Sequence, residues 1–184
     1  LFPMVSDLSE YREAREHVQH EWDRTKPPLP SSLSFGVMLE VPSIVDQLDV
    51  LLKEVDFISV GTNDLFQFFY ACDRTNPTVA NRYAVLSSSF LKYLRKIRIT
   101  CEEANIPIAI CGEMAGRPLE TLALLGIGYR SLSVPGPAAG SIKKMILSLP
   151  LDQVEALLSD ALREYSPSLR GVLTSFAKQH KVFV

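Results

Sequence analysis

The sequence predicts an α/β protein built on a parallel sheet, an incomplete TIM-type βα barrel followed by two C-terminal helices. Short runs that are apolar throughout alternate with segments of helical periodicity, which is typical of a parallel sheet covered by helices. At the ends of three of these runs lie side chains that can bind a metal ion or transfer a proton. A closed barrel needs eight strands and about 250 residues. We therefore expect about five strands in the 184 residues, one domain over 1–184 with a barrel part at 1–149 and helices at 150–184.

Each expected element has a local justification. Ser6 is a plausible N-cap for the first helix, and the prolines and serines of 25–32 predict a loop. Apolar residues three and four apart predict two final amphipathic helices, at 151–162 and 169–177, with no strand between them. The expected strands are 1–5, 34–39, 56–60, 107–111 and 131–134, and the other expected helices are 6–23, 43–54, 63–71, 88–104, 118–125 and 138–149.

Composition and charge exclude several classes of function. A net charge of −2 gives no broad attraction to nucleic acid, and the basic run 95–98 alternates with apolar residues as on a solvated helix face. Three cysteines without CxxC spacing predict neither a disulfide framework nor a zinc site. Charges interrupt every apolar stretch before it reaches the length of a membrane span, and no signal peptide is visible. We expect a cytoplasmic protein with no membrane insertion.

Glu40 and Asp64 directly follow two neighbouring expected strands. Two carboxylates in apolar surroundings repel each other unless a positive charge lies between them. Mg²⁺ is a natural counter-ion, because it accepts one or two protein carboxylates and takes further oxygen ligands from a substrate. The alternative is that each carboxylate caps the helix that follows it.

The run Gly61-Thr62-Asn63-Asp64 fits an anion site at a strand-to-helix turn. A glycine permits the tight turn, and the first N–H groups of the next helix favour an anion, to which Asn63 adds a side-chain amide. Arg74, in a polar loop beyond the next helix, is a candidate phosphate ligand if it folds back over the site. The alternative for Arg74 is a surface pair with Asp73.

Cys111 ends an apolar strand at a glycine-containing turn. A thiol is mostly protonated at neutral pH and can donate a proton or act as a nucleophile. Because no histidine lies nearby in sequence, proton donation is the more economical role, while a buried structural thiol is the common alternative. Cys72 and Cys101 are expected to fill the core, and His17, His20 and His180 to face solvent or pack.

These motifs together resemble one known family. The runs Val37-Met38-Leu39-Glu40-Val41-Pro42, Ser59-Val60-Gly61-Thr62-Asn63-Asp64-Leu65, Asp73-Arg74 and Cys111-Gly112-Glu113-Met114-Ala115-Gly116 look like the phosphoenolpyruvate-binding barrel of enzyme I of the bacterial phosphotransferase system. The opening residues 1–5 also match, so the resemblance covers nearly the whole chain. Residues 65–68 and 86–87 look more like the nitrogen-related branch of that family than the sugar-transport branch.

The resemblance implies that Glu40 and Asp64 bind Mg²⁺, that Glu40, Asp64, Asn63 and Arg74 form the substrate site, and that Cys111 is the general acid. Phosphoenolpyruvate would give pyruvate, and its phosphoryl group would pass to a histidine on a separate N-terminal domain. A histidine-containing phosphocarrier protein would receive it from that domain. That N-terminal domain and two substrate arginines of the family have no counterpart here. The chain is therefore expected to be a C-terminal piece of a longer enzyme, or a degenerate copy, and to be inactive alone.

Two other interpretations remain open. One is a non-catalytic dimerisation or regulatory module derived from the barrel. The other is a different Mg²⁺-enolate barrel enzyme of the citrate-lyase kind, although such chemistry has no need of Cys111. An unclosed parallel sheet exposes a strand edge and the apolar barrel interior, so copies of the chain are expected to associate as a homo-oligomer.

Overall fold

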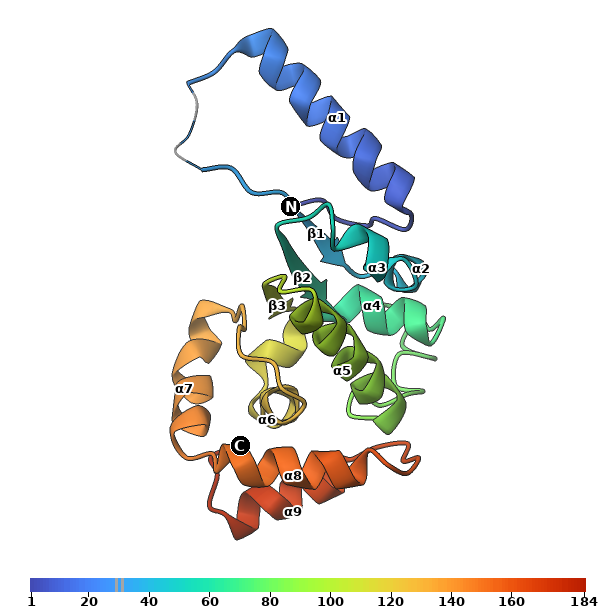
Figure 1. Cartoon of the computed structure of the whole chain (residues 1–184). Coiled ribbons are helices and arrows are strands. Elements are labelled where there is room, and N and C mark those ends of the chain that lie inside the picture. Colours follow the sequence, from blue (N-terminus) through green and yellow to red (C-terminus); the bar gives the residue numbers. More distant parts are fainter. Residues whose placement is uncertain (29, 31) are drawn as a thin grey trace.

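The computed structural model describes residues 1–28, 30 and 32–184, and it has a parallel sheet at its centre (Figure 1). Leu29 and Ser31, within the expected loop at 25–32, lie outside the described residues. The sheet has the order β1-β2-β3 and all its pairs are parallel. Its strands are β1 (Gly36–Leu39), β2 (Phe57–Gly61) and β3 (Ile108–Cys111). The predicted α/β class with a parallel sheet is confirmed.

The prediction of about five strands is wrong for the described residues, because the two outer segments form single bridges instead of strands. Phe2 pairs with Val37 at one edge, and Leu132 pairs with Ile110 at the other. At Met4 the backbone turns to φ +55°, and its N–H leaves the ladder to bond the Glu40 carboxylate. Pro3, which lacks an N–H, cannot extend the pairing either.

Helices surround the sheet and form a layer below it (Figure 1). The pattern of expected helices is confirmed with three changes: the segment 43–54 divides into two short helices, a 3₁₀ turn precedes the helix at 118, and a second 3₁₀ turn at 136–138 precedes the helix at 139. The helices are α1 (Leu8–Thr25), α2 (Pro42–Val45), α3 (Leu48–Leu51), α4 (Thr62–Phe69), α5 (Ser88–Glu103), η1 (Glu113–Gly116), α6 (Pro118–Gly126), η2 (Gly136–Ala138), α7 (Ala139–Leu147), α8 (Leu151–Ala161) and α9 (Arg170–Gln179).

The two faces of the sheet are unequally covered. Successive side chains of a strand point to opposite faces. Five alternate residues are almost completely buried in the core: Val37, Leu39, Ile58, Val60 and Ile110. The intervening residues on the other face are partly exposed: Met38, Ser59, Ala109 and Cys111. The second face is therefore the more accessible one, and it carries the polar side chains of the sheet.

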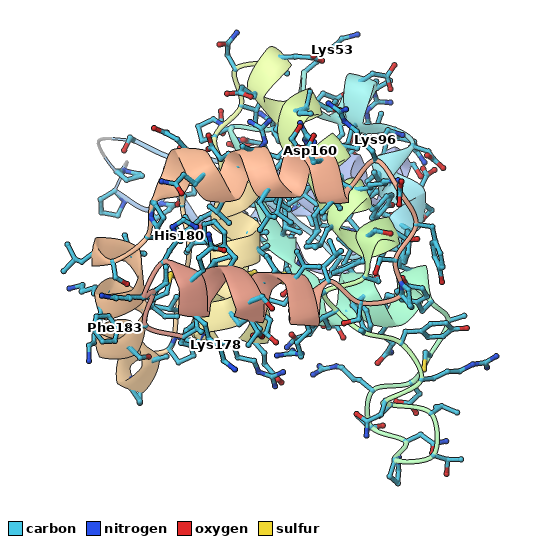
Figure 2. The ribbon with its side chains drawn as sticks, turned by 90° about the horizontal axis from the view of Figure 1, so that it is seen from below. Lys53, Lys96, Asp160, Lys178, His180 and Phe183 are labelled. Atoms are coloured by element: carbon cyan, nitrogen blue, oxygen red, sulfur yellow. The ribbon has the colours of Figure 1, made fainter. Side chains whose placement is uncertain are left out.

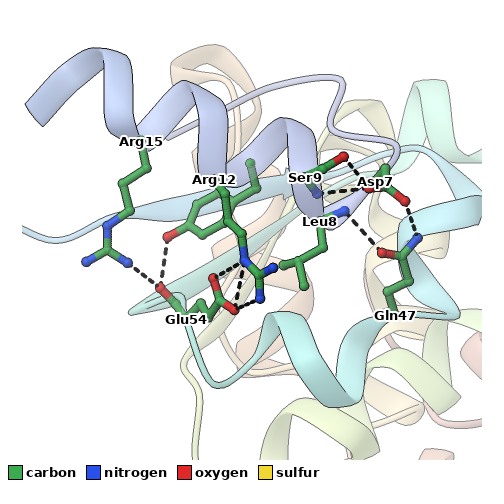
Figure 3. Close-up of polar contacts among 8 residues, drawn as sticks. Asp7, Leu8, Ser9, Arg12, Arg15, Gln47 and Glu54 are labelled. Carbon is green, nitrogen blue, oxygen red and sulfur yellow. Dashed lines mark hydrogen bonds and ion pairs between the residues drawn. The ribbon is translucent and has the colours of Figure 1, made fainter. Parts of the chain in front are cut away.

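The helix α1 lies apart from the other helices and is held to the body near its N-terminal end (Figure 3). Its N-cap is Asp7, with a capping box to Glu10, so the expected N-cap at Ser6 is wrong. Tyr11, fully buried, donates to the backbone carbonyl of Glu54 at 2.8 Å, and Arg12 forms a two-pronged ion pair with the Glu54 carboxylate. Gln47, which lies between α2 and α3, accepts a hydrogen bond from the Leu8 N–H and donates one to the Asp7 carboxylate.

The two C-terminal helices lie side by side and pack on α6 (Figure 2). A Cβ on Gly126 of α6 would lie 2.5 Å from Leu158 Cδ1 and 3.2 Å from Val154 Cγ2, so α8 approaches the α6 backbone closely. The buried Glu120 of α6 pairs with Arg170 of α9. Their expected place on the outside of the domain is confirmed. Phe183 follows α9 and lies beside α7, where Lys144 Nζ stands 3.9 Å from its ring centroid (Figure 2).

Candidate functional site

The carboxyl ends of the three strands place Glu40, Gly61 and Cys111 in one row across the sheet. Leu39 pairs with Val60 and Gly61 pairs with Cys111, so Glu40, one residue beyond β1, lies beside Gly61. A Cβ on Gly61 would stand only 2.7 Å from Glu40 Oε2, which confirms that proximity. Because Gly61 has no side chain, the Glu40 carboxylate can occupy the space that a side chain at this position would fill.

Glu40 is a buried carboxylate with few contacts that offset its lost hydration. Its side chain is 3% exposed, and Oε1 accepts a hydrogen bond from the Met4 N–H at 2.7 Å. An ionised carboxylate removed from water needs a counter-charge or several donors to offset its lost hydration. Neither α2 nor α4 has a side-chain cap hydrogen bond, so neither acid caps the next helix in that way, while Asp64 does lie in the first turn of α4, where a negative charge is favourable.

Asp64 lies in the first turn of α4, and Arg74 folds back to it from the following loop. Arg74 Nη2 stands 3.4 Å from Asp64 Oδ1, and the Arg74 backbone N–H donates to Gln67 Oε1 at 3.3 Å. Asp73, the expected alternative partner of Arg74, instead accepts hydrogen bonds from Thr75, which lower the pKa of its carboxyl. Both members of the Arg74–Asp64 pair are partly exposed, so the pair is weak enough to open for a ligand.

Asn63 is oriented by the turn after β3. Its Oδ1 accepts a hydrogen bond from the Glu113 N–H at 3.1 Å, which assigns the Nδ2 amide as the donor end of the side chain. Asn63 and Arg74 line a common cavity of about 400 Å³, together with Arg117 and Arg170. Among the described residues, Glu40, Asp64 and Cys111 do not line this cavity. Of the five expected site residues, Asn63 and Arg74 share this cavity, Asp64 is joined to them by its pair with Arg74, and Glu40 and Cys111 lie in the row at the strand ends.

The Cys111 thiol lies among polar groups of β2. Its Sγ accepts a hydrogen bond from Ser59 Oγ at 3.2 Å and donates to the Val60 carbonyl at 3.3 Å. Thr62 Oγ1 donates to the Cys111 carbonyl at 3.1 Å. Cys111 is partly exposed, in contrast to the buried Cys72 and Cys101. The alternative of an inert core thiol therefore describes the other two cysteines better than it describes Cys111.

Ser59 and Thr62 were absent from the sequence prediction, although the sequence contains a signal for Ser59. It is a polar residue inside an apolar strand, two positions before Gly61 and therefore on the same face. Thr62 has no comparable signal, because its contact depends on the turn at Gly112. That glycine adopts φ +117°, and a Cβ there would lie 2.4 Å from Thr62 Oγ1.

The donor set suits a hard cation only in part. Among the described residues, no cluster of three or more His, Cys, Asp or Glu side chains is placed to hold a metal ion. Two carboxylates at neighbouring strand ends, one of them buried with a single backbone donor, still match the one or two protein ligands that Mg²⁺ uses when a substrate supplies the rest. The two acids are therefore candidate ligands for a cation whose remaining ligands a substrate would supply.

The remaining titratable residues have structural surroundings. Burial raises the pKa of the Cys101 thiol to about 12. His17 and His20 are largely exposed on α1, and His180 packs its ring on Phe176 at 4.4 Å between centroids, as expected for solvent-facing or packing residues. No described helix is long and apolar enough to cross a bilayer.

Comparison with known proteins identifies the family. The chain belongs to the PEP-utilising enzymes, because residues 1–150 match the family described as PEP-utilising enzyme, PEP-binding domain. A relative in Escherichia coli (strain K12), named phosphoenolpyruvate-dependent phosphotransferase system, is 39% identical over 97% of this chain and 24% of its own length. The phosphoenolpyruvate-protein phosphotransferase of Mycoplasma genitalium is 31% identical over 100% of this chain and 32% of its own length.

A third relative, multiphosphoryl transfer protein 1 of Escherichia coli (strain K12), is 31% identical over 99% of this chain and 22% of its own length. The chain thus spans between a fifth and a third of these relatives. The resemblance drawn from the strand-end motifs is confirmed at the level of the family.

Proposed function

We propose that this chain is the phosphoenolpyruvate-binding and pyruvate-forming part of a phosphoenolpyruvate-protein phosphotransferase. The observation that carries the proposal is the row of Glu40, Gly61 and Cys111, in which a buried acid and an accessible thiol lie on either side of a glycine at the carboxyl ends of the strands. Membership of the family and relatives named for phosphoenolpyruvate-dependent phosphotransfer support it. We assign the chain to an incomplete TIM-type barrel, and the nitrogen-related branch stays a prediction from residues 65–68.

In this proposal each residue has a separate task. Glu40 and Asp64 hold Mg²⁺, which when bound would offset negative charge on the substrate's phosphate and enolate oxygens. Arg74 and the Nδ2 amide of Asn63 bind the phosphoryl oxygens, and the Asn63 orientation follows from its bond to the Glu113 N–H. The Asp64 carboxylate draws the Arg74 guanidinium toward this position, and Gln67 bonds the backbone N–H of the same residue.

Cys111 completes the reaction as proton donor. When the phosphoryl group leaves phosphoenolpyruvate for the acceptor histidine of another domain, an enolate of pyruvate remains. The thiol protonates the methylene carbon of that enolate, and pyruvate forms. A histidine-containing phosphocarrier protein is the proposed next acceptor. The half-open sheet face and the two single-bridge edges support association of copies, and solution scattering that gives a rigid monomer would contradict that part.

Calorimetry with phosphoenolpyruvate and Mg²⁺ tests the proposal on the chain itself. We expect Mg²⁺-dependent heat with the unmodified chain, and its loss in Glu40→Gln, which keeps the shape of the side chain and removes its charge. Glu54→Gln is the matched control, because that carboxylate lies at the Arg12 contact with α1 and should leave binding unchanged.

Three outcomes would redirect the assignment. Absence of Mg²⁺-dependent heat in the unmodified chain would favour the dimerisation or regulatory module. Undiminished binding in Glu40→Gln would remove Glu40 from the site. The third outcome concerns Cys111→Ser. If this variant still binds the ligand, and if a longer enzyme that carries it still forms pyruvate, another Mg²⁺-enolate chemistry would be favoured.

A further inference from the structure

Ser59 and Cys111 share the accessible face of the sheet. Ser59 lies opposite Ala109 in the register, and Cys111 lies two residues farther along β3, opposite Gly61. Because side chains alternate along a strand, Ser59 and Cys111 both point away from the buried Val60 and Ile110. Their side chains meet diagonally across the β2–β3 pair, with Ser59 Oγ 3.2 Å from Cys111 Sγ.

The hydrogen bonds of the sulfur have a defined direction. Ser59 donates its hydroxyl hydrogen to Sγ, and the thiol hydrogen is directed at the Val60 carbonyl at 3.3 Å. The second contact requires a thiol hydrogen, whereas the first requires only a sulfur lone pair. Once the proton has left, the bond to Val60 is lost and the bond from Ser59 becomes charge-assisted, which roughly doubles the strength of a hydrogen bond.

We infer that Ser59 is a positioning residue for Cys111, donating a hydrogen bond that fixes the thiol at the end of β3 and stabilises the thiolate left after proton donation. The inference rests on the proposed function for the identity of the proton acceptor. In that step the S–H bond breaks and leaves its electron pair on sulfur, while the enolate carbon uses its electron pair to form a C–H bond. Water then returns a proton to the thiolate.

Among the neighbours on this face, Ser59 is the residue that donates a hydrogen bond to the Cys111 sulfur. In the register row of Ser59 the adjacent side chains are Met38 and Ala109, which have no strong hydrogen-bond donor. Thr62, the other nearby hydroxyl, donates to the backbone carbonyl of Cys111 instead of its sulfur. The two hydroxyls thus act on the same residue, one on its side chain and one on its main chain, and they can be separated by mutation.

Alkylation of the folded chain by iodoacetamide tests the inference without any substrate, so its failure is distinguishable from failure of the proposed function. The rate at Cys111 is followed by peptide mass spectrometry, in which the buried Cys72 and Cys101 serve as slow internal references. We expect Ser59→Ala to slow alkylation of Cys111 by roughly 3- to 10-fold, because loss of the donor reduces the thiolate fraction and higher intrinsic nucleophilicity offsets part of that reduction.

Two further variants separate positioning from general loosening. Ser59→Thr keeps the hydroxyl and suits a strand, so its rate should return to within about twofold of the unmodified chain. Thr62→Val removes the hydroxyl that bonds the Cys111 backbone and should also stay within about twofold. A rate in Ser59→Ala equal to or faster than that of the unmodified chain overturns the inference. So does Ser59→Thr as slow as Ser59→Ala, or Thr62→Val slowed as strongly.

A spectroscopic measurement covers the case in which Ser59→Ala does not fold. The infrared S–H stretch of Cys111 is isolated as the difference between the unmodified chain and Cys111→Ser. This stretch reports the hydrogen bond that the thiol donates to Val60, so the test is whether that bond depends on the hydroxyl at position 59. A low-frequency band that is kept in Ser59→Thr and displaced in Ser59→Val, which has the shape of threonine without the hydroxyl, supports the inference. A band at the same frequency in Ser59→Val as in the unmodified chain overturns it.

Discussion

Replacement of Gly61 by alanine is the most direct perturbation of the site geometry. A Cβ at this position would meet Glu40 Oε2 at 2.7 Å, Glu40 Cβ at 3.1 Å and Met38 Cγ at 3.3 Å. The first distance is too short, so the Glu40 side chain must move. It is 3% exposed and fixed by the Met4 N–H, and it has little room to do so. Gly61 has φ −81°, which alanine adopts without strain, so the clash is the main effect.

The expected loss of stability in Gly61→Ala follows from two opposing contributions. Overpacking in a well-filled site costs about 1–3 kcal/mol, and the reduced freedom of the unfolded chain returns about 0.4–1 kcal/mol. We expect Gly61→Ala to lower the free energy of unfolding by about 1–2 kcal/mol, which for a chain of this size lowers Tm by roughly 2–8 °C. Urea denaturation followed by circular dichroism measures it. The same variant should lose Mg²⁺-dependent phosphoenolpyruvate binding, since the Glu40 carboxylate is displaced.

Gly140→Ala is the matched control for this prediction. Gly140 lies in α7, and a Cβ there meets nothing within 4 Å, so the same added methyl group should raise the free energy of unfolding by about 0.5–1 kcal/mol. If Gly61→Ala proved as stable as Gly140→Ala and bound ligand normally, the close approach of Glu40 to Gly61 would be refuted, and with it the row of site residues.

Three further predictions concern the scaffold. Tyr11→Ala should release α1, because Tyr11 is its buried anchor, and mass-spectrometric hydrogen exchange should show loss of protection across Leu8–Thr25; unchanged protection would contradict this. Leu158→Ala should lower the free energy of unfolding by about 2–5 kcal/mol in urea, since Leu158 is fully buried against α6. Burial raises the pKa of both Tyr93 and Cys101 to about 12. In the unfolded chain the pKa values of these groups are 10.0 and 9.0, so folding has to keep them neutral at high pH. Their contribution to the stability of the folded chain is complete below about pH 9 and is lost as the pH rises toward 12. Tm measured between pH 8 and 11 should fall, and in Cys101→Ala the fall should begin nearer pH 10.

Part of the site was readable because parallel strands end at one edge. Apolar runs located β1, β2 and β3, and the residues that follow them were then expected to meet. The return of Arg74 over the site was foreseen as one of two alternatives, and the structure pairs Arg74 with Asp64 at 3.4 Å, while its role as a phosphate ligand stays a prediction. The roles assigned to these residues stay predictions, because proximity does not by itself establish binding or proton transfer.

Other features were beyond local reasoning. Residues 1–5 and 131–134 have the composition of strands, yet each makes a single bridge, since pairing depends on a neighbour and on backbone geometry such as that of Met4. The N-cap of α1 moved from Ser6 to Asp7, because both residues suit the position and the capping contacts select one of them. Arg117 and Arg170, which join Asn63 and Arg74 at the cavity, come from elements whose placement no periodicity gives.

The amino-acid sequence alone determined the α/β class, the identity of the acids, amide, arginine and thiol at the strand ends, and the family, because periodicity and motif spacing are local properties of the chain. Tertiary structure decided which partners these groups have. The burial of Glu40 against Gly61, the bond from Ser59 to Cys111 and the amide orientation of Asn63 arise between segments about 20 to 50 residues apart. Such contacts depend on the register of the sheet and on the packing of its helices, and a linear pattern does not encode either one directly.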